Sequence, residues 1–186
     1  MPRIGLDLPT LIQAAAELAD AQGLEAVTLA SVAQKLRIRS PSLYNHVNGL
    51  PDLRRHLALK GLDLLTAELN GAAQGQTGDA AVYALADAYL AFARKHPGLY
   101  EAIQRAPDGG DELLAAKSGE LVGRIVGALS EYGLKGDAAL HAVRVFRSML
   151  HGFVSLERQG GFGLPLGLDA TFQMMIEIFL TGIRKL

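Results

Sequence analysis

The histidines, carboxylates and hydroxyls of this chain do not fall into the spacings that common catalytic and metal sites require. Its five histidines form no HExxH pair, and the sequence contains neither a GxxxxGK phosphate loop nor a GxSxG nucleophile turn. The chain has no cysteine, which excludes disulfides, thiol catalysis and cysteine-bound zinc. The glycine-rich run 160–163 lacks the strand-then-helix context of a dinucleotide loop. We therefore expect no enzymatic activity, no metal and no cofactor.

A different chemistry is concentrated between residues 37 and 48. This segment combines hydroxyls, an amide, an imidazole and two guanidinium groups, which are the groups that bind phosphates and hydrogen-bond to base edges. Leu43 and Val47 lie four residues apart and would form the buried side of a short helix, so its other side chains face outward. The outward residues are Ser40, Ser42, Tyr44, Asn45 and His46, and Arg37 and Arg39 come just before them. Two simpler interpretations stay open: Tyr44 packs on the core, or His46 is only a solvated helix end.

The elements that would position this segment are all helical. Apolar residues recur at three- and four-residue spacing along the chain, and no stretch shows strand-like alternation. Glycines, prolines and capping residues divide the chain into about nine predicted helices, so the predicted fold class is all-α. Thr28, Ser40, Asp79, Asp137 and Asp169 are expected to cap five of them. The predicted helices cover residues 9–22, 28–36, 40–47, 50–70, 79–96, 97–105, 111–132, 137–159 and 169–186.

The first three predicted helices are short and closely connected. Two of them, joined by the turn Arg37-Ile38-Arg39 and preceded by a third, have the geometry of a helix-turn-helix. Residues 1–60 carry a net charge of +2 and the rest of the chain −3, for a total of −1. The total excludes a uniformly basic protein, whereas a positive first part fits a local phosphate-binding surface.

The residues from Val27 to Leu53, VTLASVAQKLRIRSPSLYNHVNGLPDL, resemble the DNA-binding domain of TetR-family transcriptional regulators. The threonine cap, the VAQKL helix and the PSLYNHV helix carry the resemblance. It implies that Tyr44 and His46 contact the DNA backbone and that Thr28 lies near a phosphate. It also implies that bases are approached by Ser40, Pro41, Ser42 and Asn45. Together with Arg39 from the turn, these eight residues form the expected DNA-binding set.

Two positions depart from the family pattern. Arg37 stands where the family usually has a glycine in the turn, which raises the question of how this turn is folded. The family often has a lysine near the start of the fourth helix, where this chain reads Gly49-Leu50-Pro51. That phosphate contact is either missing or supplied by Arg54 or Arg55. We expect a DNA-binding domain at residues 1–49 and a ligand-binding and dimerisation domain at residues 50–186.

The last two predicted helices carry more apolar surface than a single core needs. On a helical wheel, the apolar arc of helix 137–159 spans roughly 200°, about twice the width of a single core-facing stripe. This surplus predicts a homodimer through a four-helix bundle, whose paired helix-turn-helix units would read a palindromic operator. The alternative is a monomer in which these helices are simply central. The expected interface residues are Val145, Met149, Leu156, Phe172, Met175 and Phe179.

The segments 92–100 and 150–157 resemble a TetR C-terminal subfamily with a Trp-His-Gly signature, although Leu150 stands in place of the tryptophan. Family members commonly hold a small apolar ligand in this part of the chain and release DNA when it binds. Plain core packing explains the same apolar residues equally well. The expected ligand contacts are Tyr89, Phe92, Tyr100, Ile103, Leu121, Ile125, Met149 and Phe153, with His151 as a polar group.

The sequence also bears on location and overall function. No apolar run approaches the ~18 residues of a membrane helix, and the first residues lack the layout of a signal peptide, so we expect a soluble, cytoplasmic protein with no membrane partner. The leading hypothesis is a homodimeric transcriptional repressor that binds double-stranded DNA and responds to a small apolar ligand. The alternative is a helical small-molecule-binding or protein-interaction protein without specific DNA readout.

Overall fold

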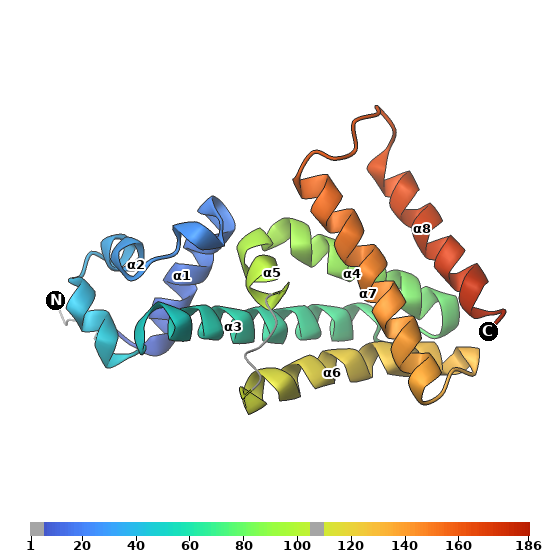
Figure 1. The fold of residues 1–186 in the computed structure, drawn as a ribbon, viewed down its shortest axis with the longest axis horizontal. Helices are drawn as coiled ribbons and strands as arrows, with labels where there is room; N and C mark the ends of the chain where they lie inside the picture. The colour runs from blue at the N-terminus through green and yellow to red at the C-terminus, as the bar shows by residue number, and fades with distance from the viewer. Residues whose placement is uncertain (1–5, 105–109) are drawn as a thin grey trace. The chain divides into compact units, whose positions relative to one another are not determined.

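The computed structural model describes residues 6–104 and 110–186, and all regular secondary structure in these ranges is helical (Figure 1). The predicted all-α class is thus confirmed, with eight α-helices and three short 3-10 helices over the described residues. Contacts divide the chain into two compact units. The first unit comprises residues 1–64 and 95–117, and the second comprises residues 65–94 and 118–186. The expected functional boundary between residues 49 and 50 stays a prediction.

The first unit begins with two helices that carry well-formed N-terminal caps. Helix α1 (Leu8–Gln22) is capped by Asp7, whose carboxylate accepts a hydrogen bond from the Thr10 amide at 2.8 Å. A short 3-10 helix, η1 (Leu24–Ala26), leads to α2 (Leu29–Leu36). Thr28 caps α2 as predicted, and Ser31 completes a reciprocal capping box with it.

The third helix differs in type from the predicted one. It is a 3-10 helix, η2 (Ser40–Asn45), held by short-range bonds such as the one from the His46 amide to the Leu43 carbonyl at 2.9 Å. Leu43 and Val47 are buried as predicted and anchor the segment on the core of the first unit. A segment of six residues with only one buried side chain inside it has little packing to hold a full α-helix, and tighter 3-10 turns are common in such short connectors.

The long helix α3 (Gly49–Ala72) runs through both units, and the first unit also contains α5 (Pro97–Gln104) and the start of α6 (Glu112–Leu129). The sequence placed the end of α5 at Arg105, which lies outside the described residues. Helix α5 packs directly on α1, because Gly98 lets the two backbones meet: a Cβ there would overlap the carbonyl of Ala19. Asp20 of α1 then caps α5, accepting from the amides of Gly98 at 2.9 Å and Leu99 at 3.1 Å.

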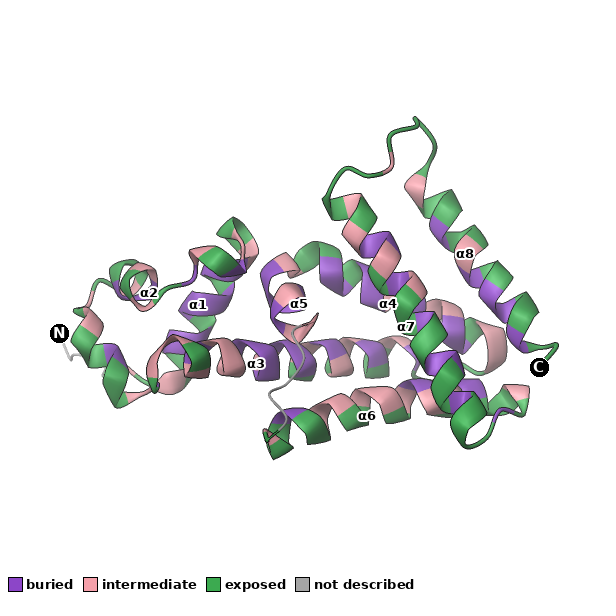
Figure 2. Cartoon of the chain, viewed as in Figure 1, coloured by how far each residue is buried: buried purple, intermediate pink, exposed green. Residues whose placement is uncertain are grey.

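The second unit includes α4 (Gly78–Lys95), η3 (Ser130–Tyr132), α7 (Asp137–Arg158) and α8 (Leu168–Ile183). Helices α7 and α8 lie side by side in opposite directions, joined by the loop between them (Figure 1). Aromatic side chains fill their seam, with ring centroids 5.0 Å apart for Phe146 and Phe179 and 4.9 Å apart for Phe153 and Phe172. Figure 2 shows the buried residues of both helices along these facing sides.

Helix α8 also pairs with α4, through a row of polar side chains in antiparallel register. The register places the first turn of one helix against the last turn of the other. Their pairs are Asp79 with Arg184, Tyr83 with Glu177, Asp87 with Gln173, and Arg94 with Asp169.

Four of the predicted helix caps are wrong. Ser40 is the first residue of η2, whose N-cap is Arg39, and η2 has no side-chain cap. The other three are aspartates. Helices α4, α7 and α8 begin at Gly78, at Asp137 and at Leu168, so the aspartates expected as caps lie inside their first turns. Neither α7 nor α8 has a side-chain cap. Asp79 instead bonds Tyr132 and Arg184, and Asp169 bonds Arg94. An acidic residue in a first turn is stabilised by the helix dipole without capping, so sequence alone does not separate the two roles.

Among the described residues, no helix combines the length and apolarity needed to cross a membrane. Within the same ranges, no three histidine or carboxylate side chains gather closely enough to hold a metal ion.

Candidate nucleic-acid interface

The eight residues of the expected DNA-binding set all reach the surface of the first unit. They come from three adjacent pieces of chain: the N-cap of α2, the turn after α2, and η2 with the residue that follows it. We call residues 40–46 the recognition segment. The exposed members of the set are Thr28, Arg39, Pro41, Ser42, Tyr44 and Asn45, and the half-buried ones are Ser40 and His46.

Tyr44 shows most clearly that this surface faces outward. Its side chain is 60% exposed, so the alternative in which its ring packs on the core is wrong. Its neighbour Leu43 is fully buried and fixes the backbone from the inside. An aromatic side chain held in solvent next to such an anchor exposes both its ring face and its hydroxyl to a partner.

Thr28 is held by the start of α2. Its hydroxyl oxygen accepts a hydrogen bond from the Ser31 amide at 3.0 Å, and its own amide donates to the Ser31 hydroxyl at 2.9 Å. The side chain is therefore fixed at the N-terminus of α2, where unpaired amides and the helix dipole favour an anion. This geometry suits the phosphate position that the family resemblance implies for Thr28.

The turn keeps its tight conformation although it lacks glycine. Arg37 adopts the left-handed conformation, with φ 56° and ψ 40°, and its amide closes the end of α2 by donating to the Ala33 and Gln34 carbonyls. The Ile38 amide donates to the Ala33 carbonyl at 3.0 Å. This is the arrangement that glycine usually provides at a helix end. Arg37 therefore adopts, without being glycine, the left-handed conformation that closes this helix end.

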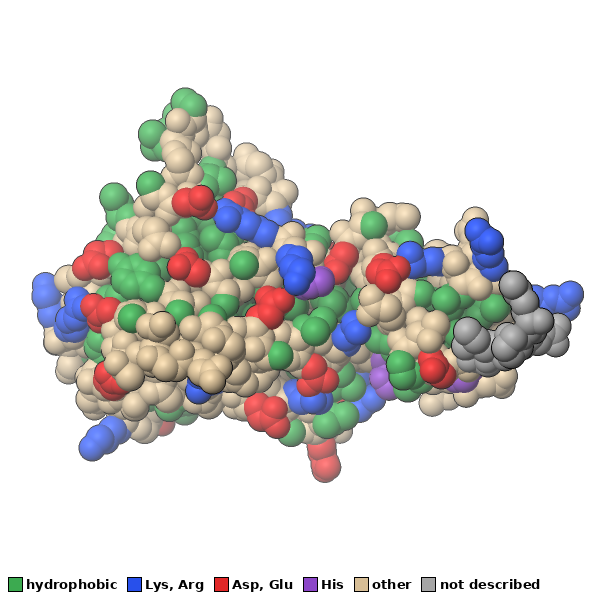
Figure 3. Space-filling view, turned by 180° about the vertical axis from the view of Figure 1, so that it is seen from behind, with side chains coloured by type: hydrophobic (Ala, Val, Ile, Leu, Met, Phe, Trp, Pro, Cys, Tyr) green, Lys and Arg blue, Asp and Glu red, His purple; other side chains and the backbone are tan. Residues whose placement is uncertain are grey.

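Most other basic side chains of the first unit are neutralised within the chain. Arg54 pairs with Glu25 at 3.0 Å. Arg55 pairs with Asp111, and this hydrogen bond is the main reason that the pKa of Asp111 lies below its ordinary value. Neither arginine is thus placed to replace the missing lysine contact without giving up its partner. The face in Figure 3 likewise carries acidic and basic side chains interspersed, not one basic coat.

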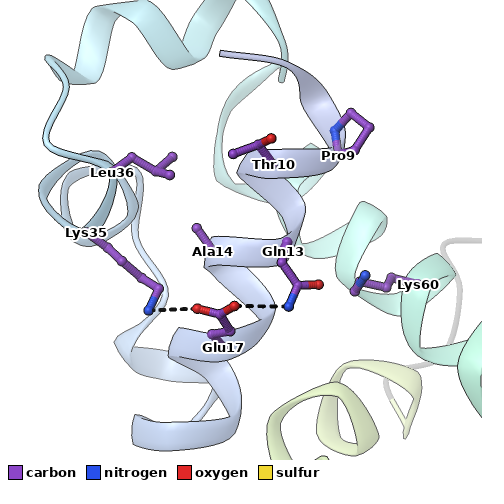
Figure 4. A pocket seen from close by; sticks show the side chains of 8 residues that line it. All are labelled: Pro9, Thr10, Gln13, Ala14, Glu17, Lys35, Leu36 and Lys60. Atoms are coloured by element: carbon purple, nitrogen blue, oxygen red, sulfur yellow. Dashed lines mark hydrogen bonds and ion pairs between the residues drawn. The ribbon is translucent and has the colours of Figure 1, made fainter. Parts of the chain in front are cut away.

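The first unit also has a groove of about 640 Å³, which was not among the sequence-based expectations (Figure 4). It lies beside α1 and includes Lys35 and Leu36 at the end of α2 and Lys60 of α3. Glu17 crosses part of it, accepting from Gln13 and pairing with Lys35, both at 3.0 Å. Lys35 is therefore another basic residue whose charge is already balanced.

The expected ligand contacts are divided between the two units. Tyr100 and Ile103 belong to the first unit, Tyr100 being buried and Ile103 half-buried. His151 is exposed. The other expected contacts belong to the second unit: Tyr89, Phe92, Ile125 and Phe153 are buried, and Leu121 and Met149 are half-buried.

The expected dimer residues separate into two groups. Phe172 and Phe179 lie in the seam with α7, 1% and 5% exposed, so a partner would not reach them. Val145 and Leu156 are exposed, and Met149 and Met175 are half-buried. Sequence reasoning missed Met174 and Ile178, which are 65% and 63% exposed on the outer side of α8. Only the position of α8 against α7 reveals which side of this almost wholly apolar helix faces out.

Comparison with known proteins agrees with this architecture. Residues 82–179 match the family model described as tetracyclin repressor-like, C-terminal domain. The chain is 38% identical over 184 residues to the uncharacterized HTH-type transcriptional regulator YobS of Bacillus subtilis, covering 98% of this chain and 95% of that protein. It is 37% identical over 182 residues to another uncharacterized HTH-type transcriptional regulator, from Mycobacterium tuberculosis, covering 97% of this chain and 83% of that one.

A solved structure supports the fold. The crystal structure of the TetR family protein ActR from Streptomyces coelicolor, in complex with (S)-DNPA, matches with a TM-score of 0.68 at 19% identity. The match covers 96% of this chain and 97% of that one. Because the family model spans more than half of the chain and the relatives match nearly all of it, this chain belongs to the TetR family of helix-turn-helix transcriptional regulators.

Proposed function

We propose that this chain is a homodimeric transcriptional repressor that binds a palindromic operator through the recognition segment and is released by a small apolar ligand. The observation that carries the proposal is a group of surface hydrogen-bonding side chains, which the buried Leu43 and Val47 anchor from the inside. The group consists of Ser40, Ser42, Tyr44, Asn45 and His46. Such a surface can hydrogen-bond to base edges without needing a large net charge.

The contacts divide into two kinds. Tyr44, His46 and Thr28 bind phosphates, which fixes the position of the protein on the duplex. Arg39 adds a full positive charge beside them. The base-reading residues are then Ser40, Pro41, Ser42 and Asn45. Few charges take part, so sequence readout depends on the fit of η2 in the major groove.

A second copy of the chain covers the outer sides of α7 and α8. Support comes from the spacing of Val145, Met149 and Leu156 along one stripe of α7, and from the exposure of Met174 and Ile178 on α8. Burying these side chains in a two-fold bundle places two recognition segments on one DNA molecule, in half-sites about 34 Å apart or a multiple of that distance. The interface proposed here replaces Phe172 and Phe179 with Met174 and Ile178.

The ligand binds in the second unit, among its aromatic and aliphatic side chains. Support comes from the family description, tetracyclin repressor-like, and from the structure of ActR with a bound small molecule. Tyr89, Phe92, Ile125, Met149 and Phe153 offer a mostly apolar lining. Release requires only that the ligand bind more tightly to the form of the dimer that does not fit the operator. A ligand with equal affinity for both forms would leave the equilibrium between them unchanged. Such a repressor acts in the cytoplasm, because the operator DNA that it binds lies there.

One observation favours the alternative of a helical binding protein without DNA readout. Arg54 and Arg55, the cations nearest to the missing lysine of the fourth helix, are committed to Glu25 and Asp111. Salt separates the two functions: binding driven by phosphates weakens steeply as salt is added, whereas ligand or protein binding need not.

A genomic DNA pull-down tests the proposal. Immobilised protein is incubated with sheared DNA of the source organism, washed at moderate salt and sequenced against a resin-only control. The proposal predicts a small set of enriched fragments that share an inverted repeat, because a two-fold dimer requires a two-fold site. No enrichment above the resin control would contradict DNA-binding function. Enriched sites without internal symmetry would contradict the palindromic operator.

A further inference from the structure

Arg37 is the one residue other than glycine with a positive φ among the residues that the structure describes. Its backbone closes the end of α2, a task for which glycine needs no special stabilisation. For any other L-residue the left-handed conformation is sterically unfavourable, and residues that adopt it often belong to functional sites. The side chain of Arg37 is exposed, so no packing inside the first unit explains why arginine occupies the position.

The charges around the turn suggest what the arginine does. In the first unit, Lys35, Arg54 and Arg55 each have a carboxylate partner. Arg37 and Arg39 are exposed, and the side chain of neither is paired with any residue of the described ranges. Both belong to the turn that leads into the recognition segment. Unpaired positive charge therefore lies directly beside the recognition segment.

We propose that Arg37 binds a DNA phosphate beside the recognition segment, and that this contact is the reason that arginine, and not glycine, occupies the left-handed position. The inference rests on the proposed DNA-binding function. A guanidinium presents two parallel N–H donors to a phosphate, which adds orientation to the charge. Arg37 positions the protein on the duplex and reads no base.

A purely structural role makes a different prediction. A cation at the C-terminus of α2 also interacts favourably with the helix dipole, without any DNA. In that case Arg37 would affect the stability of the free protein, and DNA binding would change only as far as folding did. Stability and binding must therefore be measured separately on the same variants.

The test compares Arg37→Gly, Arg37→Gln and Arg37→Lys with the wild type. Binding is followed by fluorescence anisotropy on a labelled duplex of arbitrary sequence and about 40 base pairs, long enough for a dimer to span two half-sites. A phosphate contact does not depend on base sequence, so no operator is needed. The affinity is measured at several KCl concentrations, and the unfolding midpoint of each variant is measured in urea.

We expect Arg37→Gly to unfold at a higher urea concentration, because glycine relieves the backbone strain, and yet to bind DNA about tenfold more weakly as a dimer at low salt. The slope of log affinity against log salt should fall by about 1.8, from two lost phosphate contacts at about 0.9 each. Arg37→Gln should lose binding and slope likewise without gaining stability. Arg37→Lys should keep the slope. Lys60→Gln, which removes an unpaired cation in the groove beside α1, should leave binding unchanged.

Two outcomes would overturn the inference alone: Arg37→Gly binding with wild-type affinity and slope, or Arg37→Lys losing as much slope as Arg37→Gln. If Arg39→Gln weakens binding in the same assay while Arg37→Gly does not, the DNA-binding function is supported and the proposed role of Arg37 is contradicted. If the wild type fails to bind the duplex even at low salt, the proposed function itself is wrong, and the inference falls with it.

Discussion

Asp79 joins three helical segments of the second unit through two hydrogen bonds. It accepts from the Tyr132 hydroxyl at 2.6 Å and from the Arg184 guanidinium. Burial, followed by the hydrogen bond to Asp79, raises the pKa of Tyr132, whereas the bond from Tyr132, followed by that from Arg184, lowers the pKa of Asp79. This cluster fixes the first turn of α4 against the last residues of α8, so it helps to hold in place the helix that carries the proposed dimer surface.

Tyr132 should make the stability of the protein fall at alkaline pH. Because the folded state holds the Tyr132 proton more tightly than the unfolded chain does, its contribution to the free energy of unfolding is complete below about pH 10 and is lost as pH rises further. Tyr132→Phe should lower the free energy of unfolding by about 1 kcal/mol at neutral pH and flatten the alkaline loss.

Urea unfolding of both proteins between about pH 7 and pH 11 measures this effect. Tyr44→Phe serves as the control, because Tyr44 is exposed and belongs to the first unit, whereas the Asp79 cluster belongs to the second. An alkaline loss of stability that is equally steep in Tyr132→Phe and the wild type would show that another group is responsible.

At the scale of elements, the contact of α5 with α1 links the chain beyond α4 to the helix-turn-helix. Gly98 allows the close approach, and Asp20 holds the first amides of α5. The second oxygen of Asp20 lies 2.8 Å from the ring nitrogen Nδ1 of His96. A second glycine, Gly61 of α3, makes similar room, because a Cβ there would stand 2.9 Å from Ile103.

Gly98→Ala should therefore destabilise the first unit. The added methyl group would collide with the backbone of α1, which cannot move aside as a flexible side chain would, so we expect a loss of about 1–3 kcal/mol in the free energy of unfolding. Gly123→Ala is the matched control: Gly123 lies in α6 with nothing near its Cβ position, and alanine there should stabilise the helix by about 0.5–1 kcal/mol. Equal urea midpoints for the two variants would contradict the close approach.

The sequence predicted these elements unevenly, for physical reasons. Local signals were sufficient for α1 and α2, because a cap, an apolar stripe and a stop residue lie within one stretch of chain. The cap of α5 was not predictable, since Asp20 lies 78 residues before Gly98 along the chain. The capping roles predicted for Asp79 and Asp169 were wrong for the same reason. Their hydrogen-bond partners come from other helical segments, which no local sequence pattern indicates.

The expected surfaces show a similar difference. Leu43 in the recognition segment and Val47 just after it are buried anchors that determine which side chains of the segment point outward. All eight residues of the expected DNA-binding set reach the surface. In α8 almost every side is apolar, so the sequence did not show which residues pack on α7. Phe172 and Phe179 were assigned to a partner although they complete the core of the single chain.

At the scale of the whole molecule, the exposed apolar residues of α7 and α8 are the feature that a single chain leaves unexplained. Val145, Leu156, Met174 and Ile178 are each between 49% and 65% exposed. Side chains of this kind on neighbouring helices are characteristic of surfaces that a partner covers. A second copy of this chain is the proposed partner.

Met174→Glu combined with Ile178→Glu should convert the dimer into a folded monomer, because burying two carboxylates at the interface of each subunit is too unfavourable for association. Sedimentation at micromolar concentration measures the change. Leu113→Glu, at an apolar residue of α6 that is 47% exposed, is the control and should leave the dimer intact. A wild type that sediments as a folded monomer would exclude the proposed interface.

The measurement that tests the central claim most directly is the affinity of the recognition segment for DNA. A gel-shift titration with a fragment recovered from genomic DNA would compare the wild type with the double variant Tyr44→Ala and His46→Ala, with circular dichroism to confirm folding. Four phosphate contacts per dimer would be lost, so we predict affinity about 100-fold weaker. Gln74→Ala with Gln76→Ala, in an exposed turn of the second unit, should bind like the wild type. Undiminished binding by a folded Tyr44 and His46 double variant would contradict the assignment of this surface to DNA.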